Sequence, residues 1–190
     1  TDVRFAPFVA LFLLLAAADH LLVAAPPVRG WYERNVRRGR NPARWMEYSI
    51  SASVMIVLIA MLTGISDIAA LIAIFGANAA MILFGLLMER QDGDGPVDWL
   101  PFWFGCVAGA VPWIAIAAYL IGGGEAPTFV YVIFGTLFVL FNCFAVNMVL
   151  QFRRVGRWAD RVFAERAYIA ISLVAKSALA WQVFASTLAT

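Results

Sequence analysis

Long apolar stretches recur along the chain, separated by short polar or charged connectors. A membrane-spanning helix needs about 20 mostly apolar residues, and six stretches meet this length: 5–25, 45–66, 68–88, 99–121, 127–152 and 163–187. They are rich in Ala, Leu, Ile and Phe and lack two-residue alternation, which indicates helices rather than barrel strands. We therefore predict an all-α membrane protein, with residues 1–190 forming one transmembrane helix bundle.

The composition agrees with a bilayer environment. Hydrophobic residues make up 63% of the chain and charged residues 14%, and the mean hydropathy is +0.83. Soluble domains are roughly 45–50% apolar and about 25% charged, so one water-soluble core would not hide this much apolar surface. The net charge of +2 gives no indication of a nucleic-acid partner. Cys106 and Cys143 both lie in apolar runs, so we expect neither a disulfide framework nor a metal site.

Positive charge is concentrated in two connectors, which carry eleven of the thirteen arginines. Arginine-rich loops stay in the cytoplasm, so we expect the basic loops 26–44 and 153–166 on that side of the cell membrane. The connectors 63–67 and 122–127 contain no Lys or Arg, as expected for the outer side. With six spans, this orientation makes the C-terminus extracellular.

The only lysine, Lys176, lies inside the last apolar run. It is ten residues beyond Arg166, or roughly 15 Å into the membrane, where an unpaired charged amine is costly. Ser172, four residues earlier, shares the same helix face. Glu47 opens the second run, and the only histidine, His20, lies near the end of the first. Glu47, His20 and Ser172 are predicted to lie in the cytoplasmic half of the bundle, on the side from which Lys176 could be reached.

Two interpretations fit such a lysine. In the first, Lys176 forms a structural ion pair with Glu47 or Asp19, as in a small membrane transporter or scaffold. In the second, it carries an aldehyde chromophore as a Schiff base, and Glu47 is the best counterion for the protonated imine. Deep aromatic residues would wall a slot for a flat apolar ligand, and they are Trp113, Phe141, Phe144 and Trp181. The sequence offers no nucleophile–base pair or metal cluster, so we do not expect an enzyme.

Three regions of the sequence together resemble a known family. Residues 44–53 read Arg-Trp-Met-Glu-Tyr-Ser-Ile-Ser-Ala-Ser. Residues 100–106 read Leu-Pro-Phe-Trp-Phe-Gly-Cys, followed by Val-Pro-Trp at 111–113. Glu-Arg-Ala-Tyr at 165–168 precedes Ser-Leu-Val-Ala-Lys-Ser-Ala-Leu-Ala-Trp-Gln at 172–182. These regions resemble the counterion helix, the fifth helix and the retinal-binding seventh helix of heliorhodopsin, a divergent family of microbial rhodopsins, and the likeness runs along nearly the whole chain.

The resemblance implies a light-absorbing photoreceptor with a rhodopsin-like bundle and an extracellular C-terminus. All-trans retinal would be bound covalently to Lys176, with Glu47 as the counterion of its protonated Schiff base. Ser172 would be the hydroxyl beside the Schiff base, and His20 a histidine of the nearby polar cavity. The resemblance also implies these residues as pocket walls: Asn78, Met81, Trp113, Phe141 and Trp181.

The chain departs from the family pattern in two ways. Six of an expected seven spans are visible, because the run 5–25 matches the family's second helix, and we expect the first to be lost upstream of Thr1 or absent. Asp19 is a carboxylate where the family tends to be apolar.

The resemblance also implies a homodimer. The Gly105–Gly109 pattern is typical of close helix packing, either within the bundle or at a dimer contact. The basic loop between Gly30 and Arg44 suits anionic lipid head groups or a cytoplasmic signalling partner.

The residues around Lys176 argue against ion pumping. Ion-pumping rhodopsins keep a second carboxylate four residues before the retinal lysine, and proton pumps keep a donor eleven residues after the counterion. Here these positions are Ser172 and Leu58. We therefore predict light absorption and conformational switching for sensing, without efficient transport.

Overall fold

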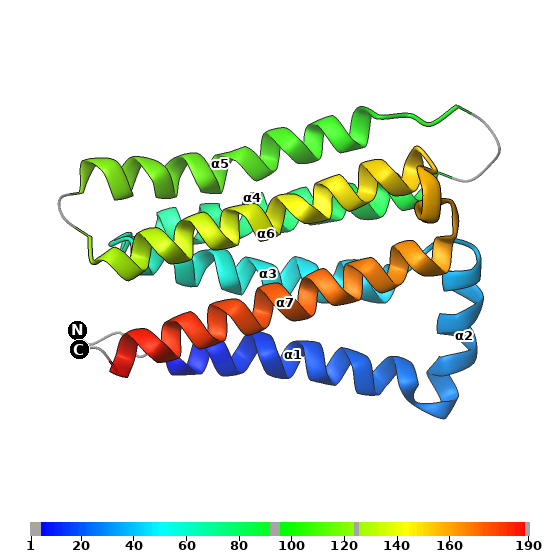
Figure 1. The fold of residues 1–190 in the computed structure, drawn as a ribbon, viewed down its shortest axis with the longest axis horizontal. Coiled ribbons are helices and arrows are strands. Elements are labelled where there is room, and N and C mark those ends of the chain that lie inside the picture. Colours follow the sequence, from blue (N-terminus) through cyan, green and yellow to red (C-terminus); the bar gives the residue numbers. More distant parts are fainter. Residues whose placement is uncertain (1–4, 92–95, 124–125, 189–190) are drawn as a thin grey trace.

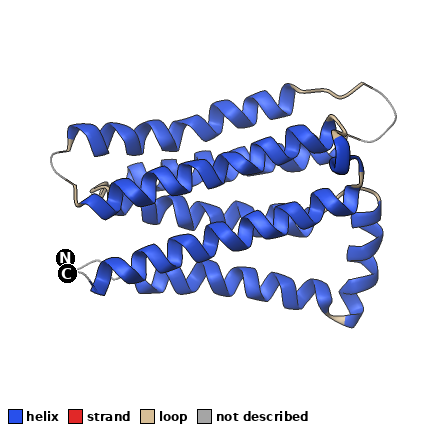
Figure 2. Cartoon of the chain, in the orientation of Figure 1, coloured by secondary structure: helices blue, strands red, loops and turns tan. Residues whose placement is uncertain are grey.

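A computed structural model describes residues 5–91, 96–123 and 126–188. In these ranges the chain forms seven α-helices and one short 3-10 helix, and no strand (Figure 2). Residues 1–4, 92–95, 124–125 and 189–190 of the predicted 1–190 domain lie outside the described residues. The prediction of an all-α fold is confirmed.

Six long helices account for the six predicted spans. The elements are α1 (Ala6–Ala24), α2 (Pro26–Arg37), α3 (Pro42–Leu62), α4 (Ile68–Arg90), α5 (Leu100–Gly122), α6 (Thr128–Phe152), η1 (Gly156–Ala159) and α7 (Arg161–Leu188). All the α-helices except α2 are long and apolar enough to cross a membrane. The largest difference from the predicted bounds is at α3, which begins where the Asn41 side chain accepts a hydrogen bond from the Arg44 amide and ends before Gly64, whose φ of 100° suits only glycine.

Helix α2 lies where we predicted only a basic loop. Ala25 is extended, with ψ 139°, and Pro26 and Pro27 follow it at the first positions of α2. Proline disfavours a helical residue before it but suits the first turn of a helix, so the pair ends α1 and begins α2. One face of α2 carries exposed arginines, such as Arg34 and Arg37, whereas Tyr32 on the other face is partly buried.

Figure 1 shows the long helices side by side, with α2 running across one end of the bundle. The connections from α4 to α5 and from α6 to α7 lie at the same end, so every arginine in the described ranges lies at or near it. We call this the arginine end. The start of α1, the end of α7 and the other two connections lie at the opposite end.

Glycines allow α4 to approach its neighbours closely. A Cβ added at Gly105 of α5 would lie 3.4 Å from the Met81 carbonyl oxygen, and one at Gly109 would overlap the Met81 side chain. The Gly105–Gly109 pattern therefore serves packing between α4 and α5. Toward α3, a Cβ at Gly85 would overlap the Trp45 ring, so Gly85 makes room on α4 for that ring.

A buried charge cluster ties three helices together near the arginine end. Arg44 of α3, whose side chain is 3% exposed, forms ion pairs with Glu89 of α4 and Glu165 of α7. Its guanidinium also lies 3.8 Å from the centre of the Tyr168 ring, and Asn41 donates to Glu165 at 2.7 Å. We call these five residues the Arg44 cluster.

Replacing Arg44 by Met is expected to lower the free energy of unfolding by about 3–5 kcal/mol, because Glu89 and Glu165 would be left buried without their cation. The measurement is denaturant unfolding followed by tryptophan fluorescence. Arg34→Met, on the exposed face of α2, is the control and should change the value by at most about 0.5 kcal/mol. Equal effects of the two substitutions would contradict the role assigned to the Arg44 cluster.

Candidate functional site

The centre of the site is an ion pair between α7 and α3. The Nζ atom of Lys176 donates to both carboxylate oxygens of Glu47, at 2.8 and 3.1 Å. The two side chains are only 7% and 6% exposed. A buried pair survives only with good geometry, because both charges lose their hydration, and the two-oxygen contact meets that condition.

Polar side chains continue from this pair toward the arginine end. Lys176 Nζ lies 5.2 Å from the centre of the Tyr48 ring. The Tyr48 hydroxyl donates to the Tyr168 carbonyl oxygen at 3.1 Å. Tyr168 in turn packs against Arg44. The lysine is thus connected with the Arg44 cluster by the contacts of two tyrosines.

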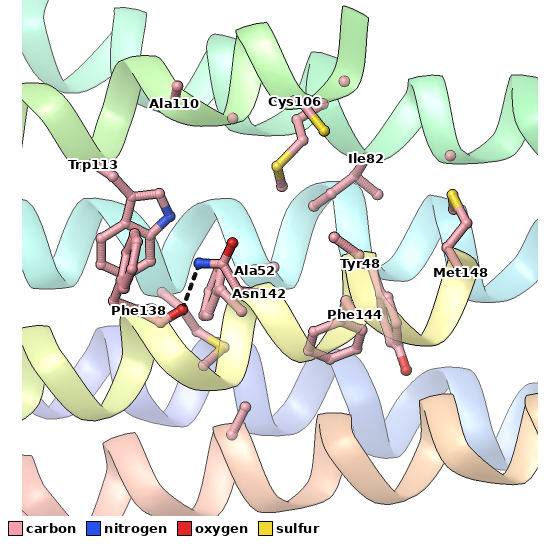
Figure 3. Close-up of a pocket in the computed structure, with 18 of the residues that line it drawn as sticks. Tyr48, Ala52, Ile82, Cys106, Ala110, Trp113, Phe138, Asn142, Phe144 and Met148 are labelled. Atoms are coloured by element: carbon pink, nitrogen blue, oxygen red, sulfur yellow. Dashed lines mark hydrogen bonds between the residues drawn. The ribbon is translucent and has the colours of Figure 1, made fainter. Parts of the chain in front are cut away.

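A cavity of about 590 Å³ lies beside the pair and includes Lys176 and Ser172 in its wall. Most of the wall is apolar and aromatic, and it comes from α3 to α7. Figure 3 shows Trp113, Phe138, Phe144 and Tyr48 among the lining side chains. The Trp113 ring meets the rings of Phe134, Phe138 and Phe141 edge to face, with centroids 5.2–5.6 Å apart.

The cavity opens to the outer surface between α5 and α6. Cys106 and Ile114 on α5, and Phe138 and Asn142 on α6, line the cavity and are also exposed. The Asn142 amide donates to the Phe138 carbonyl oxygen at 2.8 Å (Figure 3), which satisfies one polar group inside an apolar wall. Because six helices are of membrane-spanning type, this opening faces lipid tails.

The residues proposed from the sequence divide into two groups. Those that line the cavity or contact its lysine are Lys176, Glu47, Ser172, Met81, Trp113 and Phe141. The structure does not bring Asn78, Trp181 or His20 to the cavity wall.

Each of these three exceptions has a local reason. Asn78 is 1% exposed but donates to the Ser53 hydroxyl on α3, at 3.0 Å. Trp181 is 68% exposed, because a position five residues after Lys176 points to nearly the opposite side of the helix. The His20 side chain is 64% exposed and lies 3.8 Å from Asp19.

Several residues of the site could not be recognised from the sequence. Tyr48 was within a recognised motif, but only the position of α7 brings it to Lys176. Phe138 and Met148 occur in an apolar run where nothing marks one face of α6 as the cavity wall. Glu89 and Glu165 stand near the ends of apolar runs, where charged residues normally face the membrane surface.

These residues fit retinal, a long apolar aldehyde. The Lys176 amine lies in the wall of an aromatic cavity large enough for an apolar ligand. Glu47 supplies a buried negative charge beside that amine. Lys176 is the only lysine of the sequence, so it is the only side-chain amine that could react with an aldehyde.

Comparison with known proteins gives one family. Residues 1–188 match the sequence pattern of the family described as Heliorhodopsin. A search of curated proteins finds no match. Because the family pattern covers nearly the whole chain, and the structure is an all-helical bundle with six apolar helices of spanning length, the protein belongs to the heliorhodopsin family of retinal-binding, light-sensing rhodopsins.

Proposed function

We propose that this protein is a sensory photoreceptor in which Lys176 holds all-trans retinal covalently as a protonated Schiff base, with Glu47 as counterion. The observation that carries the proposal is the buried Lys176–Glu47 pair in contact with a large aromatic cavity. Bound retinal would supply the conjugated system that absorbs visible light. The protein's residues would bind it, hold a negative charge near the attachment nitrogen and exclude water.

The opening between α5 and α6 supports the proposal that the ligand is apolar and enters the cavity from the bilayer. Cys106, Ile114 and Phe138 at this opening are apolar or weakly polar and face lipid. Retinal dissolves in lipid, so this surface offers it a direct path to the cavity. Met81, Trp113 and Phe141 would then contact the bound molecule.

The second interpretation, a transporter or scaffold with Lys176 and Glu47 as a structural pair, explains the hydrogen bonds equally well. It gives no role to the cavity of about 590 Å³ that the lysine helps to line. A close-packed interior has few voids larger than a water molecule. The cavity therefore favours a ligand-binding protein.

The apolar interior of α3 on the side away from the arginine end supports a sensory role and not ion pumping. Ser172 and Leu58 occupy the positions where pumps keep ionisable groups. Leu58 is fully buried, and the buried α3 side chains from Val54 to Ala60 are all apolar. A charge moving away from the arginine end would meet no polar side chain among them.

Orientation and partners belong to the same proposal. The arginine end would lie in the cytoplasm, with α2 on anionic lipid or against a signalling partner, and the C-terminus would be extracellular. Gly105 and Gly109 already contact α4, so a homodimer would use other side chains. The outward apolar residues Trp103, Val107 and Val111 of α5, which are 51–69% exposed, are suited to that contact.

Lys176→Ala and Lys176→Arg should both stay colourless when all-trans retinal is added to membranes that hold the full chain. Arginine keeps a positive charge opposite Glu47 but does not form the linkage, so it is the matched control for loss of the ion pair. Absorption spectra and unfolding curves together make the measurement. A visible band in a correctly folded Lys176→Arg protein would refute covalent attachment, and a colourless wild type would refute retinal binding.

Glu47→Gln should move the visible band to longer wavelength, because the carboxylate no longer stabilises positive charge at the nitrogen end of the pigment in its ground state. Glu47→Asp keeps the charge and should cause a much smaller shift. Absorption spectra of the two variants at the same pH decide the question. If Glu47→Gln had no effect on the spectrum even in a chain that also carries Asp19→Asn, Glu47 would not be the counterion.

Illumination of sealed vesicles that contain the pigment should produce no sustained pH change and no steady photocurrent. The physical reason is the apolar stretch of α3 between Val54 and Ala60. Vesicles with the colourless Lys176→Arg chain give the baseline, and a protonophore tests for a true gradient. A steady light-driven pH shift that the protonophore removes would contradict the proposed sensory role.

A further inference from the structure

Asp19 lies on the face of α1 that packs against the bundle. Phe12, seven residues earlier and fully buried, lies almost directly below it on the same face, since seven residues make nearly two turns. The Asp19 side chain is 18% exposed, whereas that of the next residue, His20, is 64% exposed. Asp19 therefore points inward, and His20 points outward.

Asp19 and Glu47 lie at matching depth. Asp19 is five residues before the end of α1 at Ala24, and Glu47 is five residues after the start of α3 at Pro42. At 1.5 Å per residue both are about 7.5 Å from their helix ends, which lie at the arginine end. The Asp19 carboxylate is close enough to interact electrostatically with both Glu47 and Lys176.

The charged and titratable groups facing Asp19 come from four helices. They are His20 on α1, Tyr32 on α2, Glu47 on α3 and Lys176 on α7. Burial raises the pKa of the Tyr32 hydroxyl above its usual value, so α2 adds no charge here. Apart from His20, Lys176 is thus the only basic side chain of this group, and it faces two carboxylates.

One buried cation does not compensate two buried anions. Glu47 makes both short contacts with Lys176 and balances its charge. A second ionised carboxylate beside them would lose hydration and meet the repulsion of Glu47. Carboxyl groups that share one site in this way separate their roles, so that one is ionised and the other holds a proton.

We propose that Asp19 is a second carboxylate of the Lys176 site, which holds a proton while Glu47 is ionised and becomes the negative charge of the site when Glu47 is neutral. The inference rests on the proposed function for its role with retinal, but the exchange between the carboxyl groups is a property of the protein alone. When Glu47 is neutral, the proton leaves the Asp19 carboxyl for bulk water past the exposed His20.

The first test uses infrared spectra of the retinal-free full chain in vesicles near neutral pH. A protonated carboxyl has a C=O band distinct from that of a carboxylate, and the wild-type minus Asp19→Asn difference isolates this band for Asp19. Glu89 and Glu165 contribute equally to both spectra and cancel. Glu33→Gln, at an exposed arginine-paired site on α2, is the control and should leave the band unchanged.

The expected result is a protonated Asp19 band in wild type that disappears in Glu47→Gln, because Asp19 ionises there. A difference spectrum without that band, or a band that persists in Glu47→Gln, would overturn the proposal. The infrared test needs no retinal, so its result is valid even if the chain forms no pigment.

The second test adds all-trans retinal. Glu47→Gln should keep a visible band because Asp19 supplies the counter-charge, and the double variant Asp19→Asn, Glu47→Gln should absorb in the near-ultraviolet at the same pH. Asp19→Asn alone should stay visible. A Glu47→Gln protein that has already lost its visible band, to the same extent as the double variant, would show that Asp19 does not replace Glu47.

Discussion

The Arg44 cluster sets the relative positions of the helices on which the site depends. One cation placed between Glu89 and Glu165 joins α3 with α4 and α7, and the pairing stays satisfied only while the three helices keep their register. One turn further along α3, Tyr48 meets the backbone of Tyr168.

Lys176, two turns beyond Tyr168, completes this arrangement. Side chains on a helix tilt toward its N-terminus, which is the direction from Lys176 back to Glu47. The pair therefore forms although the two residues start at different heights on their helices. A bundle held differently at the arginine end would leave one buried charge without its partner.

Close packing on one side of α5 leaves room on the other. Gly105 and Gly109 draw α5 against α4, and the rings of Trp113, Phe138 and Phe141 keep α6 at a distance. The space between is the cavity, open toward lipid. Aromatic rings and small residues thus create an apolar volume beside the buried Lys176–Glu47 pair. A charged chromophore with a long apolar tail requires both features.

The all-helical bundle and its six spans were predictable from the sequence, because hydropathy and helical periodicity are local properties of each segment. Motifs on three helices were enough to indicate the family. Depth along the helices indicated that Glu47, His20 and Ser172 lie within reach of Lys176, and the choice of its ion-pair partner between Glu47 and Asp19 stayed open. The packing of the helices placed Glu47 in contact with Lys176, turned Trp181 outward and Asn78 toward Ser53. It also gathered Glu89 and Glu165 around Arg44. These features depend on the tilt, rotation and close approach of helices far apart in the sequence, and no pattern within one helix carries that information.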